Sequence, residues 1–136
     1  MIKFIIPLPP ISKKNSQRIM VNRQTGKPFI SPSKQYKDYE SAAMWFVPKL
    51  RQPKPINQPV NVKCLFYMQT KRLVDKSNLE GAIHDIIVKA GLLEDDNRDI
   101  IAGTDGSRVF YDKENPRTEV YITPLDGYEQ WGRKEK

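Results

Sequence analysis

The sequence has almost none of the side chains from which cysteine-based and histidine-based sites are built. It contains one cysteine, Cys64, and one histidine, His84. A single cysteine excludes an internal disulfide and a zinc site with several cysteines, and its place in an alternating apolar run predicts a buried, inert thiol. A single histidine excludes nucleases that need one histidine as a base and another as a metal ligand.

Long apolar runs and two common motifs are also missing. No segment approaches the roughly 20 apolar residues of a membrane-spanning helix, and the opening MIKFIIPLPP has too short an apolar run for a secretory signal. We therefore expect a soluble, cytoplasmic protein without a membrane partner. No GxxxxGK[ST] occurs, which excludes a P-loop ATPase. No acidic residue is followed two positions later by Lys, which sets aside the restriction-type nucleases.

The length and the hydrophobic pattern predict one small α+β domain. The 136 residues suit a single domain, which we expect over residues 1–125, with a flexible tail over 126–136. Ser77 and Glu80 form a capping-box pattern, so the second helix is expected to begin at Ser77 and to stop at Gly91. The predicted order is a strand at 2–7, a hairpin at 19–31, a helix from 33 to about 48, a strand at 60–70, a helix at 77–91, and strands at 100–111 and 118–122. This order suggests a mixed sheet with two helices packed on one face.

The charge is unevenly distributed along the chain. The formal net charge is +7; residues 1–37 hold eight Lys or Arg and no acid, whereas residues 75–99 hold seven acidic and three basic residues. A basic surface attracts nucleic acid, and an acidic cluster would repel it unless a cation lies between them. The pattern thus favours a divalent metal between the protein and a polyanion, although a solvated surface of mixed charge is the simpler alternative.

Four aspartates surround the second predicted helix. Asp75 precedes it, Asp85 lies within it, and Asp95 and Asp96 follow its end. If the next strand folds back beside the helix, these side chains can converge. Mg²⁺ takes oxygen ligands and needs only a few carboxylates beside water and phosphate. The alternative is structural: Asp75 can favour the helix dipole, and Asp95 and Asp96 can be turn residues.

Three separated segments resemble the RusA family of Holliday junction resolvases. They are the run from Val74 to Leu79 (VDKSNL) followed by Asp85, the run from Gly91 to Asp96 (GLLEDD), and the run from Pro9 to Ser16 (PPISKKNS). In order and spacing they are similar to the family's Asp-x-Asp-Asn-Leu, helix, closing Asp-Asp and basic proline-lysine-asparagine loop. The likeness extends to about Leu125.

The resemblance implies a homodimeric, Mg²⁺-dependent endonuclease, with Mn²⁺ as a possible substitute, that nicks a four-way DNA junction symmetrically and is common in phages and prophages. Asp75 and Asp96 match the first and last catalytic aspartates and would hold the metal together with Asp85, and Asp85 or Asp95 could supply a missing carboxylate. Two positions depart from the pattern. Ser77 stands where a second aspartate is usual, and Gly81 where a lysine is usual.

The predicted DNA contacts come from the basic N-terminal arm and from the start of the second helix. They are Lys13, Lys14, Asn15, Arg18, Arg23, Lys76 and Asn78. Two other functions remain open from the sequence. One is a catalytically weakened protein of the same fold that binds branched DNA, and the other is a structural phage protein that uses the acidic segment as a protein interface.

Overall fold

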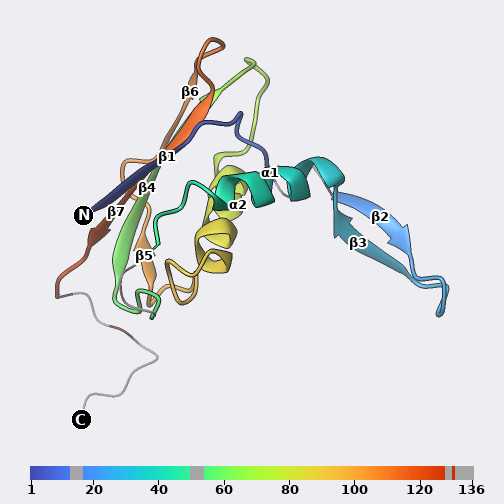
Figure 1. The fold of residues 1–136 in the computed structure, drawn as a ribbon, viewed down its shortest axis with the longest axis horizontal. Helices are drawn as coiled ribbons and strands as arrows, with labels where there is room; N and C mark the ends of the chain where they lie inside the picture. The colour runs from blue at the N-terminus through green and yellow to red at the C-terminus, as the bar shows by residue number, and fades with distance from the viewer. Residues whose placement is uncertain (13–16, 50–53, 128–129, 131–136) are drawn as a thin grey trace.

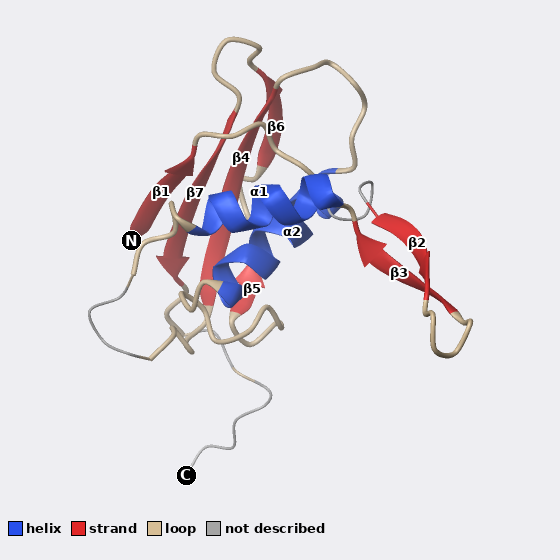
Figure 2. Ribbon diagram, turned by 45° about the vertical axis from the view of Figure 1, so that its right-hand side comes forward, coloured by secondary structure: helices blue, strands red, loops and turns tan. Residues whose placement is uncertain are grey.

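The computed structural model describes residues 1–12, 17–49, 54–127 and 130. They form a five-stranded sheet with two helices on one face, and a two-stranded hairpin that projects away from the sheet on the helix side (Figure 1). The elements are β1 (Ile2–Ile6), β2 (Gln17–Val21), β3 (Pro28–Pro32), α1 (Lys34–Met44), β4 (Val60–Met68), α2 (Lys76–Lys89), β5 (Ile101–Gly103), β6 (Arg108–Tyr111) and β7 (Arg117–Pro124). The predicted α+β fold, with both helices on one face of a mixed sheet, is confirmed (Figure 2).

The sheet is organised around β4. One edge of β4 pairs antiparallel with β7, and β7 in turn pairs antiparallel with β1. The other edge pairs in parallel with two short strands, β5 near its start and β6 near its end. The single strand predicted over 100–111 is therefore two strands, separated by a turn in which Gly106 adopts a φ of 88°.

The core lies between the sheet and the helices. Every second side chain of β4 from Val60 to Phe66 is buried, as expected for a strand with one face on the core. Cys64 is fully buried, which confirms that part of the prediction, and burial raises the pKa of its thiol. The helical side of this core comprises Tyr36, Tyr39 and Ala43 of α1 and Leu79, Ala82, Ile83, Ile86 and Ile87 of α2.

Helix α1 begins where the sequence predicts and ends earlier. Ser33 is its N-cap, but the helix stops at Met44 rather than near Pro48. Beyond Met44 the backbone forms a turn of the 3₁₀ type, because the amide of Phe46 donates to the carbonyl of Ala43, three residues back, at 3.0 Å. The last predicted turn is therefore not α-helical.

The N-cap of helix α2 lies two residues before the predicted capping residue, Ser77. This N-cap is Asp75, whose carboxylate accepts hydrogen bonds from the backbone amide of Ser77 at 3.0 Å and from the Ser77 hydroxyl at 2.7 Å. Glu80 pairs with Lys76 instead of reaching back to Ser77. The capping-box prediction is wrong because the carboxylate of Asp75 accepts from both donors that Ser77 carries. The predicted end is confirmed: Gly91 has a φ of 83° directly after the last turn.

The hairpin and the chain end complete the description. Among the described strands, β2 and β3 pair only with each other, which confirms the hairpin predicted over 19–31. In the part of the chain that the structure describes, neither helix is long and apolar enough to cross a membrane. The predicted flexible tail lies mostly outside the described residues. Within it, the side-chain amide of Gln130 donates to the carbonyls of Asn57 and Asp99 at 2.9 and 3.0 Å.

The cap at Asp75 predicts a difference between two substitutions. Asp75→Ala removes the acceptor for both hydrogen bonds from Ser77 and should lower the free energy of unfolding by about 1 kcal/mol, as measured by urea denaturation. Asp75→Asn keeps a good capping side chain and should stay within a few tenths of a kcal/mol of the wild type. Asp126→Ala, at an exposed position with no helix to cap, is the control. Equal stability of the two Asp75 variants would contradict the capping role.

Candidate active site

The first group of predicted site residues lies at the N-terminal end of α2. Asp75 is exposed and engages Ser77 as described above. The ammonium of Lys76 lies 2.7 Å from a carboxylate oxygen of Glu80, so Lys76 forms an ion pair with a residue one turn further along α2. Asn78 is half-buried in the first turn. The partial positive charge of a helix N-terminus stabilises a carboxylate at this position. A structural role is therefore enough to account for Asp75.

The second group lies beyond the C-terminal end of α2. Asp95 accepts hydrogen bonds from the backbone amide of Asp96 at 2.7 Å and from the side-chain amide of Asn97 at 3.2 Å. The bond from the Asp96 amide is the main reason why the pKa of Asp95 is lowered. Partial burial, followed by the neighbouring carboxylates of Asp95 and Asp85, raises the pKa of Asp96. The negative charge of Asp95 and Asp85 therefore acts on Asp96.

The length of α2 separates the two groups. Asp75 and Asp85 are ten residues apart along one helix, which corresponds to about 15 Å at 1.5 Å per residue. A single ion cannot bind both carboxylates of one chain across that distance. In residues 1–12, 17–49, 54–127 and 130, no three Asp, Glu, His or Cys side chains are placed to hold a metal ion together. The structure thus places Asp75 at one end of α2 and Asp85, Asp95 and Asp96 towards the other, without bringing three of them together as a metal site within one chain.

The single histidine lies between the two groups. His84 is half-buried on α2. Burial lowers the pKa of its imidazole, against the opposing effect of the carboxylates of Glu80, Asp96 and Asp85. Its Nε2 atom has no hydrogen-bond partner among the described residues. Burial therefore opposes protonation of the imidazole more strongly than the neighbouring carboxylates favour it.

Sequence reasoning missed a basic loop that leads into Asp75. Lys71 and Arg72 are exposed, and the side chain of Leu73 between them and the helix is fully exposed. The ammonium of Lys71 lies 5.0 Å from the centre of the Tyr111 ring, a cation–π contact that links this loop to β6. The signal was present in the sequence, because the pair Lys71-Arg72 stands directly upstream of the aspartate motif.

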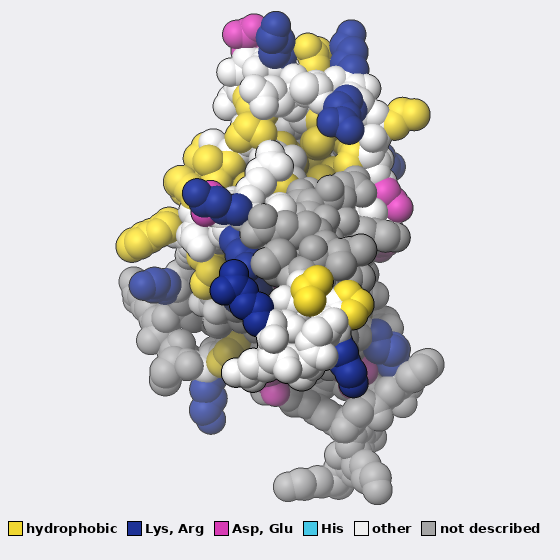
Figure 3. Space-filling view, turned by 90° about the vertical axis from the view of Figure 1, so that its right-hand side faces the viewer, with side chains coloured by type: hydrophobic (Ala, Val, Ile, Leu, Met, Phe, Trp, Pro, Cys, Tyr) yellow, Lys and Arg dark blue, Asp and Glu magenta, His cyan; other side chains and the backbone are white. Residues whose placement is uncertain are grey.

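The predicted DNA contacts of the N-terminal arm are only partly described. Lys13, Lys14 and Asn15 lie outside the described residues, and Arg18 belongs to β2. Arg23 is exposed in the turn of the hairpin. Viewed from the hairpin side, the surface carries Lys and Arg side chains over the hairpin and over the body behind it (Figure 3). The hairpin thus carries cationic groups away from the body of the protein.

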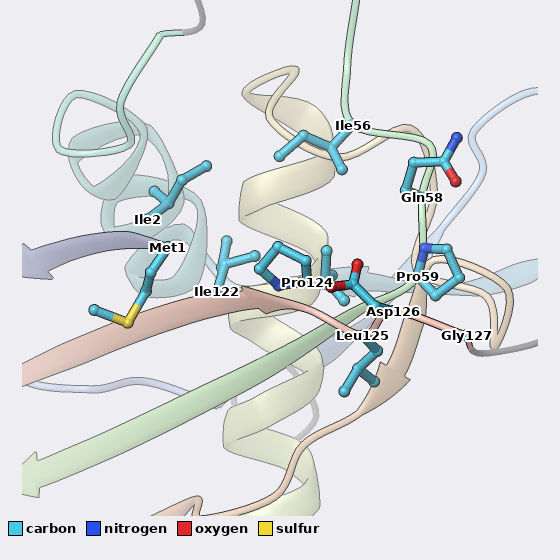
Figure 4. A pocket seen from close by; sticks show the side chains of 11 residues that line it. Met1, Ile2, Ile56, Gln58, Pro59, Ile122, Pro124, Leu125, Asp126 and Gly127 are labelled. Atoms are coloured by element: carbon cyan, nitrogen blue, oxygen red, sulfur yellow. The ribbon is translucent and has the colours of Figure 1, made fainter.

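Two cavities differ in their relation to these residues. A groove of about 250 Å³ lies beside the loop that leads into α2; its lining includes Pro10, Ser12, Gln35, Thr70, Arg72 and Val74. A second cavity, of about 470 Å³, lies where β4 begins and β7 ends, and Met1, Ile56, Pro59, Pro124 and Leu125 are among its lining residues (Figure 4). None of the four predicted aspartates lines the second cavity. None of them lines the first groove either, whose lining reaches the loop before α2 at Arg72, Leu73 and Val74.

Comparison with known proteins assigns the chain to a family. The family model described as Endodeoxyribonuclease RusA matches residues 7–123. That range contains the basic N-terminal segment, α2 and all four aspartates. No curated protein matches the chain. The match confirms the predicted enzyme class, an endodeoxyribonuclease of the Holliday junction resolvase type, and the chain belongs to the RusA family.

Proposed function

We propose that this protein is a Mg²⁺-dependent homodimer that resolves Holliday junctions or related branched DNA by symmetric nicking. The observation that carries the proposal is the family match over residues 7–123, which includes every carboxylate of the candidate site. Mn²⁺ is expected to replace Mg²⁺. A cytoplasmic location and a phage or prophage origin belong to the same proposal.

The donors at the site suit a hard divalent cation. Members of the RusA family generally depend on such a metal, and the four aspartates offer carboxylate oxygens, the ligands that Mg²⁺ and Mn²⁺ prefer. Partial burial and then the neighbouring carboxylates of Asp95 and Asp85 raise the pKa of Asp96, and a bound cation would relieve the repulsion between these carboxylates. When bound, the ion would supply a water of lowered pKa and charge neutralisation at the scissile phosphate. In this assignment Asp75, Asp85 and Asp96 hold the ion, and Asp95 supports Asp96.

The separation of the carboxylates favours a site shared between two chains. The midpoint between Asp75 and Asp85 falls beside Gly81, which is exposed, and a β-carbon built there meets no atom within 4 Å. Two α2 helices that cross antiparallel at Gly81 would place Asp75 of one chain beside Asp85 and Asp96 of the other. A two-fold axis then generates two equivalent sites, as two symmetric cuts require.

Other residues would position the DNA. Lys71 and Arg72 stand beside Asp75 and can neutralise phosphates next to the site. Lys76 and Asn78 extend this contact along the first turn of α2. The N-terminal arm, with Lys13, Lys14, Asn15, Arg18 and Arg23, is proposed to bind phosphates on the duplex arms of the junction. These contacts carry no sequence information by themselves, so we expect them to set affinity.

One observation supports a second candidate, a weakened enzyme that mainly binds branched DNA. Ser77 occupies the usual aspartate position, and its hydroxyl is committed to the carboxylate of Asp75 at 2.7 Å. The site therefore has one negative charge fewer than the family pattern. Nicking of a synthetic four-way junction by the wild-type protein, titrated with Mg²⁺, decides between the two: binding without nicking at any concentration would establish the second.

Removal of single carboxylates should separate cleavage from binding. Asp75→Asn and Asp96→Asn should each reduce Mg²⁺-dependent nicking of a four-way junction by at least about a hundredfold, since each removes a metal ligand. Binding of the same junction in EDTA should be unchanged or tighter, because one negative charge near a polyanion is lost. Nicking is measured on denaturing gels and binding by fluorescence anisotropy.

Asp126→Asn is the matched control for these variants. It removes an exposed carboxylate at the far end of β7 and should leave nicking at the wild-type rate. A parallel loss of binding and cleavage in the Asp75 and Asp96 variants would indicate misfolding, and full activity of either variant would contradict its assignment as a ligand.

Mixing of the two inactive variants tests the shared site directly. In a dimer with one Asp75→Asn chain and one Asp96→Asn chain, a site built from Asp75 of one chain and Asp96 of the other is intact once and doubly altered once. About half of the dimers formed by random exchange are mixed. The mixture should therefore nick one strand of the junction, whereas each variant alone is inactive.

A site contained within one chain gives the opposite result. Each mixed dimer would then carry one altered ligand in both sites, and the mixture would stay inactive. Sedimentation at micromolar concentration shows whether dimers are present, and a strictly monomeric protein bound to junctions would contradict the homodimer itself.

A further inference from the structure

The face of the sheet that the helices leave uncovered has an organised surface. α1 and α2 both pack on the other face (Figures 1 and 2). Side chains on one face of a strand recur at every second residue, and the pairing registers align them in rows across the sheet. The outward rows are Arg117, Tyr67 and Phe110; Ile5, Glu119, Leu65 and Arg108; and Lys3, Tyr121 and Lys63. We refer to these ten side chains as the outer face.

The first row is a stacked column with one open end. The guanidinium of Arg117 lies 3.8 Å from the centre of the Tyr67 ring, and the Phe110 ring stacks on Tyr67 with centroids 5.1 Å apart and planes inclined by 23°. Arg117 is fixed in place by ion pairs with Glu119 at 2.9 Å and with Asp112 at 3.0 Å. Phe110 lies at the edge of the sheet and is 44% exposed. The column therefore ends in an accessible aromatic ring.

The remaining rows supply cations beside the rings. The ammonium groups of Lys3 and Lys63 lie 5.2 and 4.5 Å from the centre of the Tyr121 ring, one from each neighbouring strand. Arg108 is exposed beside Phe110 in β6. Four of the ten outer-face side chains are cationic, and Glu119, which pairs with Arg117, is the one anionic side chain among them. The outer face is thus positively charged around its aromatic rings.

Accessible rings among cations are suited to one class of ligand, an unpaired nucleic acid strand. Bases without a partner can stack on aromatic side chains projecting from a sheet while their phosphates contact neighbouring cations. Bases in a duplex are stacked on one another and do not reach such rings. A second copy of this chain fits poorly, because the faces would bring like charges together. We propose that the outer face binds single-stranded DNA, with a base stacked on Phe110 and phosphates near Lys3, Lys63 and Arg108.

This site goes beyond the proposed nuclease function. It lies on the face of the sheet opposite to α2, and it requires neither the aspartates nor a metal ion. The two proposals can therefore fail separately. Asp75→Asn should keep single-stranded DNA binding. If the outer face does not bind single-stranded DNA, the Mg²⁺ titration of junction nicking still tests the nuclease function.

The test is anisotropy of a fluorescein-labelled oligothymidylate with the full chain in EDTA. Phe110→Ala should weaken binding at least about fivefold, the lower limit for loss of one stacked base. Phe46→Ala is the matched control, since Phe46 is 42% exposed and follows α1 on the opposite side of the sheet. It should bind as the wild type does. Phe110→Leu keeps an apolar contact with Tyr67 but removes the ring, and it should show the same loss if Phe110→Ala is unstable.

Salt dependence tests the cationic rows independently. Replacing Lys3 and Lys63 together with Gln should flatten the slope of log affinity against log salt by about 1.4, or 0.7 for each lost phosphate contact. The proposal is overturned if the wild-type protein does not bind the oligonucleotide, if Phe46→Ala weakens binding as much as Phe110→Ala does, or if a duplex of equal length shows the same dependence on Phe110. Dissociation of the dimer by Phe110→Ala would also overturn it, because the outer face would then be an interface between copies.

Discussion

The rigidity of α2 is the constraint on which the candidate site depends. A helix of 14 residues holds its two ends at a fixed distance, and its inner side is anchored by five buried residues against the sheet. Asp75 caps one end, while Asp85, Asp95 and Asp96 lie towards the other. Because the helix cannot shorten, any chemistry that uses both ends must bring a second helix alongside it. The geometry of the active site therefore depends on how two chains assemble.

The distribution of charge along α2 is not the one that stability alone favours. A carboxylate at the N-terminus of a helix is stabilising, which suits Asp75. Carboxylates at the C-terminal end face the negative end of the helix dipole, and there the pKa of Asp96 is raised further by burial and by its neighbours. Groups with unfavourable electrostatics in the folded state often serve a function. Asp96 is therefore a stronger indication of function than Asp75, for which helix capping is a sufficient structural role.

The sequence predicts the elements better than their boundaries and contacts. Alternation along β4 and the apolar stripe of α2 are local patterns, and both were recognised. The N-cap was not, because Asp75 and Ser77 are both good capping residues. The division into β5 and β6 depends on Asn61, whose side chain bonds both backbone groups of Asp105, 44 residues away, at 2.8 and 3.1 Å. No local pattern contains such a contact. The separation of Asp75 from Asp85 was implicit in the helix itself, since ten helical residues span about 15 Å.

The position of β7 between β1 and β4 has a consequence for how the chain folds. Ile2, in the first strand, pairs with Ile122, in the last. β1 has no other partner in the five-stranded sheet, so it joins the sheet only after nearly the whole chain has been synthesised. Pairing of such distant residues is slow, since a long loop must close before any contact forms. During translation β1 remains unpaired until β7 has been synthesised. A ribosome that stalls before β7 would leave an exposed edge on β4.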